Sequence, residues 1–355
     1  MSERTIRVGI FGAGHIVNQR YLTGYKQVPN AEVVAIADVV EGRAARLAEQ
    51  WGVPRAYTDY RDMLALPEID AVHICTPPFT HCETTVAAFE AGKHVYVEKP
   101  PALSADEVRR MVAAGRAAGK LLMMGSNAVY YPEQQALKKL IDKGELGEIY
   151  YAKILGFSRR GAPHGWFREK AKAGGGPLMD GVSHSMDIFL FLTSTPRPVS
   201  VVGRTYDTFR HDSGETNRYL AADIAEGAKD VPVSDVEDLA TGFVQFENGL
   251  TLTVDTSWKI HLEMQGGTFI AGTMAGARLG WSGLEIFRDV DGQPTSEVIQ
   301  LPEEEKSHVQ AIRHFVECVR EGRETDSPGE RSIVTMTIFD ALYRSAAEGG
   351  REIRL

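Results

Sequence analysis

The chain has 355 residues, of which 43% are hydrophobic and 25% are charged, and its formal net charge at pH 7 is −9. This length accommodates two domains, and the negative charge argues against non-specific nucleic-acid binding, which needs a basic surface. We therefore expect no nucleic-acid partner, and because no run of about 18 apolar residues exists we also expect no membrane span. Cys75, Cys82 and Cys318 form no disulfide framework and no secretory signal is visible, so we expect a cytoplasmic protein.

Residues 6–124 alternate short apolar runs with segments of helical spacing. The runs are IRVGIFG, EVVAIAD, AVHICTP, KHVYVEKP and LLMMGSN. Continuous apolar runs are typical of parallel strands that are buried on both faces. The helical segments between them end at Gly, and Ser104 with Glu107 forms a capping box at the start of one. Repeated βα units predict an α/β fold: a doubly wound, parallel Rossmann sheet over residues 1–125 that binds a dinucleotide.

The stretch VGIFGAGHIVNQRY follows the first predicted strand and opens a helix. Gly12 permits the tight turn, and Gly14 lets a pyrophosphate approach the backbone at the helix N-terminus. We assign His15 and Ile16, which continue this turn, to the cofactor site as well. Val17 stands where the G-x-G-x-x-G/A pattern usually has a small residue.

The second predicted strand ends at Asp38, about 20 residues beyond the glycines, where an acidic residue commonly binds the ribose hydroxyls. A carboxylate would repel the 2′-phosphate of NADP, so Asp38 favours NAD. Arg43 lies nearby in the sequence and keeps NADP possible. Alternatively, Asp38 only caps the turn that follows.

The segment CTPPFTHCETT begins at the carboxyl end of another predicted strand, the edge where open α/β sheets bind ligands. Thr76 and Pro77 would form a rigid wall of the cofactor site, and His81 begins the next helix. An ordinary strand-to-helix turn is the alternative.

The strand HVYVE is followed by Lys99, Pro100 and Pro101, on the edge that carries Gly12 and Asp38. The Lys99 amine can donate to a substrate hydroxyl or carbonyl, and desolvation would lower its pKa toward the range of a general acid or base. Glu98 can bind the cofactor ribose or hold Lys99, and Pro100 fixes the backbone direction, with a cis bond as one option. A surface salt bridge at a strand end is the alternative.

From about residue 126 the pattern changes. PEQQALKKLIDKGELGEI predicts a helix, and LATGFVQFENGLTLTVDTSW predicts two antiparallel strands joined at Asn248-Gly249. Further alternating segments and two helices near 308–321 and 329–348 complete a C-terminal α+β domain over residues 126–355. Its sheet is expected to be open and mostly antiparallel, and residues 225–238 are the most loop-like. An uncovered sheet face predicts a homodimer or homotetramer.

The stretch AGGGPLMDGVSHSMDIFLFL places Asp180, His184 and Asp187 at spacings of four and three, on one face of a predicted helix. A neutral His beside a carboxylate can accept the proton of an alcohol. Metal binding and a purely structural His are the alternatives, and we assign no metal. Upstream, Trp166 and Arg168 suit a sugar or the nicotinamide.

These motifs together resemble the glucose-fructose oxidoreductase / inositol dehydrogenase (Gfo/Idh/MocA) family over nearly the whole chain. The resemblance implies an N-terminal Rossmann domain and a C-terminal domain whose open sheet packs against another subunit. It also implies oxidation or reduction of a hydroxyl or carbonyl on a sugar, inositol or related polyol with NAD(H) or NADP(H). Lys99 would bond the reacting oxygen, His184 would be the acid/base, and Asp180 would orient His184 or contact substrate. The cofactor would be lined by Gly12, Gly14, Asp38, Thr76, His81, Glu98 and Asn127.

Two departures from the family pattern carry expectations of their own. Gly181 follows Asp180 directly, where the family often has Gly one residue later, so the local helix geometry is expected to differ. Ala128-Val129-Tyr130 replaces a frequent Arg-Arg-Phe, which disfavours an anionic substrate. Two other functions are kept open: an NAD-bound sugar sensor without turnover, and a lyase or glycoside hydrolase that uses NAD transiently.

Overall fold

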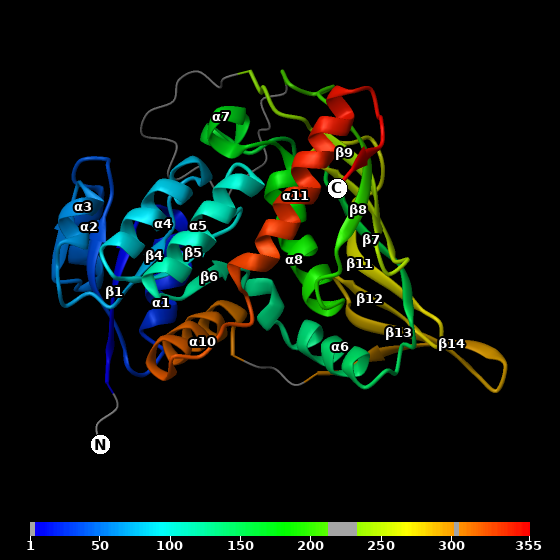
Figure 1. The fold of residues 1–355 in the computed structure, drawn as a ribbon, viewed down its shortest axis with the longest axis horizontal. Coiled ribbons are helices and arrows are strands. Elements are labelled where there is room, and N and C mark those ends of the chain that lie inside the picture. Colours follow the sequence, from blue (N-terminus) through cyan, green and yellow to red (C-terminus); the bar gives the residue numbers. More distant parts are fainter. Residues whose placement is uncertain (1–3, 212–232, 302–304) are drawn as a thin grey trace. The chain divides into compact units, whose positions relative to one another are not determined.

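The structure is a computed structural model that describes residues 4–211, 233–301 and 305–355. The chain divides into two compact units (Figure 1). Unit 1 comprises Met1–Asn127 and Glu305–Ile333, and unit 2 comprises Ala128–Glu304 and Val334–Leu355. The predicted division at residues 125 and 126 differs from this one mainly in the segment Glu305–Ile333, which the prediction placed in the second domain.

Unit 1 is built on a parallel sheet of six strands in the order β3-β2-β1-β4-β5-β6. This confirms the predicted doubly wound sheet, and it is the strand order of dinucleotide-binding folds. Its elements are β1 (Ile6–Phe11), η1 (Val17–Tyr21), α1 (Leu22–Tyr25), β2 (Ala31–Ala37), α2 (Arg43–Trp51), β3 (Arg55–Tyr57), α3 (Tyr60–Leu64), β4 (Ala71–Ile74), η2 (Pro78–Thr80), α4 (His81–Glu90), β5 (His94–Glu98), α5 (Ala105–Ala118), β6 (Leu122–Gly125) and α10 (Ser307–Glu321).

Apolar side chains from both faces of this sheet form the core of unit 1. Val8, Ile10, Val72 and Val95 are fully buried, as expected for strands with helices on both faces. Helix α5 begins at the predicted capping box, in which the Ser104 hydroxyl accepts from a backbone N–H 3.3 Å away. The order of the strands reverses between β1 and β4, so the loops after these two strands start side by side at the carboxyl edge.

The segment Glu305–Ile333 completes unit 1 from far along the chain. Helix α10 contacts α1 and β1, and its Phe315 ring lies 5.4 Å from the ring of Tyr96 in β5. Beyond the helix, the Ser327 carbonyl accepts from the N–H of Met124 in β6 at 2.9 Å. Because the apolar side of α10 is covered here, the segment is part of the Rossmann unit.

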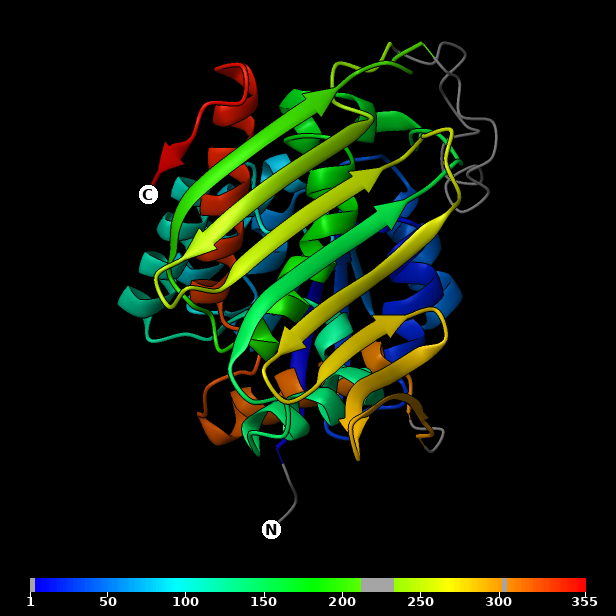
Figure 2. The same cartoon turned by 90° about the vertical axis from the view of Figure 1, so that its right-hand side faces the viewer.

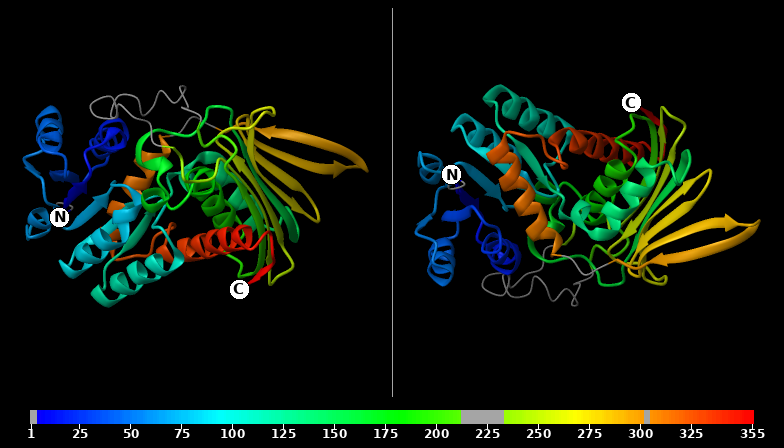
Figure 3. Two further views of the ribbon diagram at one scale, coloured as in Figure 1. Left: turned by 90° about the horizontal axis from the view of Figure 1, so that it is seen from above. Right: turned by 90° about the horizontal axis from the view of Figure 1, so that it is seen from below.

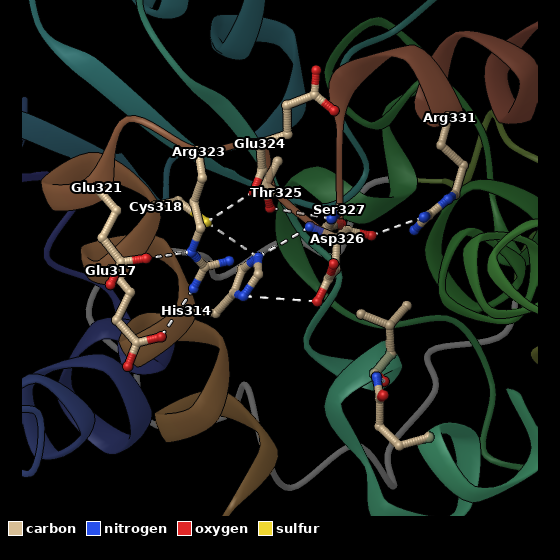
Figure 4. Close-up of polar contacts among 12 residues, drawn as sticks. His314, Glu317, Cys318, Glu321, Arg323, Glu324, Thr325, Asp326, Ser327 and Arg331 are labelled. Atoms are coloured by element: carbon tan, nitrogen blue, oxygen red, sulfur yellow. Dashed lines mark hydrogen bonds and ion pairs between the residues drawn. The ribbon is translucent and has the colours of Figure 1, made fainter. Parts of the chain in front are cut away.

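The turn that ends α10 is held by a cluster of polar contacts around the buried Cys318 (Figure 4). His314 Nε2 accepts from the N–H of Asp326 at 3.0 Å, and the Cys318 thiol donates to the Glu324 carbonyl at 3.2 Å. Arg323 pairs with Glu317 at 3.0 Å. Burial raises the pKa of the Cys318 thiol to about 11, so this cysteine is a protonated structural donor at neutral pH.

Unit 2 is built on a sheet of nine strands in the order β14-β13-β12-β11-β7-β10-β9-β8-β15. Every neighbouring pair is antiparallel except β7 and β10, which confirms the mostly antiparallel prediction. The elements after η3 (Asn127–Tyr130) are α6 (Pro132–Asp142), β7 (Ile149–Phe157), η4 (Gly165–Arg168), α7 (Lys170–Ala173), η5 (Leu178–Val182), α8 (Ser183–Leu192), β8 (Pro198–Tyr206), β9 (Leu239–Phe246), β10 (Thr251–Ser257), β11 (Gln265–Gly272), β12 (Gly276–Gly280), β13 (Gly283–Val290), β14 (Gln293–Ile299), α11 (Gly329–Ala347) and β15 (Ile353–Arg354).

The two faces of this sheet differ in what covers them (Figures 2 and 3). On the inner face, Leu342 of α11 lies directly over Gly203 and Gly242, where a side chain would collide with it. The outer face carries polar pairs such as Lys153 with Asp255, 3.3 Å apart. No helix of unit 2 covers that outer face in the part of the chain that the structure describes.

Candidate functional site

The Gly-rich turn after β1 has a shape that only glycine allows at its first position. Gly12 has φ +95°, and a Cβ there would lie 2.9 Å from the carbonyl oxygen of Cys75. Gly14 differs, because a Cβ added there meets nothing within 4 Å. The fold therefore requires Gly12, whereas Gly14 leaves open a space that a pyrophosphate can fill. Val17 is fully buried and begins the π-helical turn η1.

Gly14→Ala is therefore expected to fold normally and to bind NAD roughly tenfold or more weakly, because the added methyl group occupies the space of the pyrophosphate. Isothermal titration with NAD measures the affinity, and thermal unfolding without cofactor provides the control. A variant that binds NAD as well as the unmodified chain contradicts this role of Gly14.

Asp38 joins the end of β2 to the Gly-rich turn. One carboxylate oxygen accepts from the N–H of Ala13 at 2.8 Å, and the other accepts from the N–H of Val40 at 2.9 Å. Arg43 stands 3.6 Å from the second oxygen. Asp38 thus caps the turn, which was the alternative interpretation. Because a carboxylate has about four lone-pair positions, it can also accept from ribose hydroxyls.

His81 holds two loops of the carboxyl edge together. It is fully buried, with Nε2 2.6 Å from the Thr76 carbonyl and Nδ1 3.0 Å from the Pro100 carbonyl. Burial lowers its pKa to about 4, so the ring is neutral at pH 7 and its single N–H donates to one of the two carbonyls. Both ring nitrogens face the main chain, which favours a positioning role over direct contact with a cofactor.

Asn127 has a comparable bridging position. Its amide oxygen accepts from the Tyr96 hydroxyl at 2.7 Å, and its amide nitrogen donates to the Tyr21 hydroxyl at 3.1 Å. The ring of His73, buried between them, stacks on Tyr96 at 4.1 Å. This network ties the helix of the Gly-rich turn to β5 and β6. The sequence showed Asn127 but gave no local signal for its partners.

The end of β5 places a half-buried acid beside Lys99. Glu98 Oε2 accepts from the backbone N–H of Lys99 at 3.1 Å. Its Oε1 is buried and has no hydrogen-bond partner among the described residues. Burial raises the pKa of Glu98 to about 7, although the Lys99 charge acts in the opposite direction. The Lys99–Pro100 peptide bond is cis.

The raised pKa of Glu98 predicts a pH-dependent stability. The folded chain holds this proton more tightly than the unfolded chain, so stability falls as pH rises from about 4.5 to about 7 and is level above that range. Glu98→Gln, which stays neutral, is expected to remove this part of the decline. Urea unfolding across the range measures it, with exposed Glu90→Gln as the matched control. Equal pH dependence in all three proteins contradicts the assignment.

In unit 2, the triple-glycine turn is shaped by buried neighbours. A Cβ on Gly175 would collide with the Tyr343 hydroxyl, and one on Gly176 would collide with the Glu237 carbonyl. The Glu237 carboxylate accepts from the N–H of Leu178 at 3.3 Å and from Tyr343 at 2.9 Å. Residues 225–232 of the predicted loop lie outside the described residues, but Glu237 is buried. The triple-glycine turn therefore packs closely against Glu237, whose carboxylate is held by Tyr343.

Asp180 and His184 follow this turn, but not on a continuous α-helix as predicted. Leu178–Val182 is the π-helix η5, and α-helical geometry begins only at Ser183. Gly181, which was expected to change the local helix geometry, lies within this π-helix. π-Helical turns are frequent at functional sites.

Trp258 binds the predicted site residue Asp180, and no sequence motif pointed to it. Its indole N–H donates to Asp180 Oδ2 at 3.3 Å. It follows β10 directly and is 7% exposed. The two residues are 78 positions apart, so no local pattern could pair them.

The other predicted substrate residues of unit 2 have structural partners. Arg168 is 1% exposed, and its guanidinium donates to the carbonyls of Pro163 at 3.0 Å and Ala162 at 3.3 Å. Burial lowers its pKa. Trp166 stacks on Phe167 with ring centroids 3.9 Å apart. A role of Arg168 in holding its own loop is thus visible, while contact of Arg168 or Trp166 with a sugar stays a prediction.

Metal binding by Asp180, His184 and Asp187 was one alternative. Within residues 4–211, 233–301 and 305–355, no group of three or more His, Cys, Asp or Glu side chains is arranged to hold a metal ion. Asp187 is instead 5% exposed on α8.

None of the helices within residues 4–211, 233–301 and 305–355 is long and apolar enough to cross a membrane.

The strand order of unit 1 and its Gly-rich turn define a dinucleotide-binding class of protein. A family model described as an oxidoreductase family with an NAD-binding Rossmann fold matches residues 6–126. The model of the Gfo/Idh/MocA C-terminal domain matches residues 134–278. The chain belongs to the Gfo/Idh/MocA family, and its cofactor is NAD.

Relatives extend the likeness over the whole chain. D-glucoside 3-dehydrogenase of Escherichia coli (strain K12) is 29% identical over 99% of this chain and 98% of its own. scyllo-Inositol 2-dehydrogenase (NAD(+)) of Bacillus subtilis (strain 168) is 28% identical over 90% and 88%. A levoglucosan dehydrogenase solved with NADH has the same fold, with a TM-score of 0.86, 22% identity and 99% coverage of both chains.

Proposed function

We propose that the chain is an NAD-dependent dehydrogenase that transfers a hydride between nicotinamide and a ring hydroxyl or carbonyl of a neutral sugar or cyclic polyol. One observation supports this most strongly: Glu98 ends β5 and Lys99 follows it, at the carboxyl edge of the sheet that carries the Gly12 turn. An amine beside a half-buried acid thus stands at the edge where dinucleotides bind.

Bound NAD supplies the hydride acceptor. Gly12, Gly14 and Asp38 would hold its pyrophosphate and ribose, with His81 and Asn127 fixing the loops around them. In the oxidation, the carbinol carbon loses a hydride and the hydroxyl loses a proton, which leaves a carbonyl. His184 accepts that proton, and Lys99 donates a hydrogen bond to the reacting oxygen. Asp180 keeps the His184 ring oriented. The meeting of the Lys99 amine and the His184 imidazole over one nicotinamide ring stays a prediction.

A neutral substrate fits two observations. The residues after Asn127 are Ala128, Val129 and Tyr130, at positions where the family often has Arg-Arg-Phe, and all three are buried. The named relatives act, by their names, on a glucoside and an inositol. Both are uncharged rings rich in hydroxyl groups.

The deciding experiment is a panel of sugars, glucosides and inositols with NAD and with NADP, read by the absorbance of the reduced nicotinamide. Reduction of NAD with at least one ring polyol supports the proposal. Binding of NAD without reduction across the panel favours a sensor. A co-purifying nucleotide and substrate cleavage without net NADH favour a lyase or glycoside hydrolase.

We also propose that unit 2 associates through its uncovered sheet face into a homodimer or homotetramer. Phe243 is 39% exposed in β9 on that face, and such exposed apolar groups favour self-association. Light scattering measures the mass in solution, and a monomeric mass contradicts the proposal.

We also propose a cytoplasmic location. The free thiols of Cys75, Cys82 and Cys318 fit a reducing cytoplasm, and fractionation of cells that express the chain tests this location.

A further inference from the structure

We propose that Trp258 is a positioning residue for the dehydrogenase reaction, whose indole N–H holds the Asp180 carboxylate in the orientation that His184 requires. This rests on the proposed function, because it gives Asp180 and His184 their catalytic roles. All three residues belong to unit 2. Trp258, which directly follows β10, joins Asp180 from η5 and His184 from the first turn of α8.

The main chain of Trp258 is fixed on both sides. Its N–H donates to the Asp238 carbonyl at 3.0 Å, and its own carbonyl accepts from the N–H of Gly161 at 2.9 Å. The carboxylate of Asp238 is in turn bound by the N–H of Phe209. With the backbone held and the ring 7% exposed, the indole has little freedom to turn away from Asp180.

The Asp180 backbone is fixed as well. Its N–H donates to the Gly176 carbonyl at 3.0 Å, and its carbonyl accepts from the Ser183 hydroxyl at 3.0 Å. What these bonds leave undetermined is the rotation of the carboxylate. The bond from Trp258 to Oδ2 restrains that rotation.

Indole is a suitable group for this task. It only donates, and it does not titrate, so it cannot take the proton that His184 is to receive. A donor to the charged form also stabilises the carboxylate. A hydroxyl or a second imidazole at this position would be able to accept as well as donate, and would leave the direction of the hydrogen bond open.

Trp258→Phe keeps a large buried ring and removes the donor. We expect kcat to fall roughly ten- to a hundredfold, the range for loss of a hydrogen bond to a charged group, with the KM for NAD nearly unchanged. In an Asp180→Ala background the same change is expected to have little further effect. Trp51→Phe is the matched control, because it removes an indole bond to Asn18 of 2.8 Å in unit 1, and it should leave kcat within about twofold.

A packing role is separated from a donor role by Trp258→His. Phe fills the site better, but only His retains an N–H. The proposal predicts that His supports faster turnover than Phe; the reverse order overturns it, as does a Phe variant with normal kcat or full additivity with Asp180→Ala. If the unmodified chain does not reduce NAD with any substrate of the panel, the proposed function fails instead. Normal turnover of Asp180→Ala likewise contradicts the role of Asp180, independently of Trp258.

Discussion

Replacing Lys99 by Met or His184 by Ala is expected to lower turnover by about a hundred- to ten-thousandfold, the usual contribution of a general acid or base. Affinity for NAD should stay within about threefold, because neither change touches the Gly-rich turn or Asp38. Met preserves most of the apolar stem of Lys99 and removes only its charge and donors. Steady-state rates on the substrate found in the panel give the loss, and titration with NAD gives the affinity.

Lys120→Met is the matched control for the lysine, since Lys120 is a half-buried lysine of unit 1 at the opposite end of its strand, just before β6. It should turn over normally. If Lys99→Met or His184→Ala retains near-normal turnover while NAD still binds, the assignment of proton transfer to these two residues is wrong. If the double variant loses no more than the worse single variant, the two groups act as one unit.

The parts of the site that the sequence predicted are those with local causes. Gly12 and the Glu98-Lys99-Pro100 turn are recognisable because the order of strand, turn and helix is written in consecutive residues. Their location at one edge of the sheet follows from the parallel direction of the strands alone. For the same reason the hairpin at Asn248-Gly249 was predictable: Gly249 has φ +84°, which the turn requires.

What the sequence could not predict depends on non-local packing. The apolar side of α10 indicates that it is covered, but not by which sheet, so its membership of unit 1 was missed. The π-helix η5 differs from an α-helix by less than one residue per turn over five residues, too little for a pattern to register. Arg168 was expected to contact a sugar or the nicotinamide because it is a cationic group beside a glycine loop; its hydrogen bonds to the carbonyls of Pro163 and Ala162 had no signal in the sequence.

Gly176→Ala is expected to destabilise unit 2 by about 3 kcal/mol or more, although it adds a single methyl group. The obstacle is the backbone carbonyl of Glu237, which no side-chain rotation can remove. Displacing it would also disturb the Glu237 carboxylate that supports Leu178 and the start of η5. Activity should therefore fall with stability, because η5 carries Asp180. Differential scanning calorimetry measures the change in unfolding temperature.

Gly181→Ala is the matched comparison, five residues along the same segment. A Cβ there meets nothing within 4 Å, so the change should be neutral, or stabilising by about 0.4–1 kcal/mol through the entropy of the unfolded chain. Equal unfolding temperatures for the two variants would contradict the docking of the glycine turn on Glu237. A large difference would mean that the glycines before η5 are needed for close approach, and that Gly181, despite standing beside Asp180, is not.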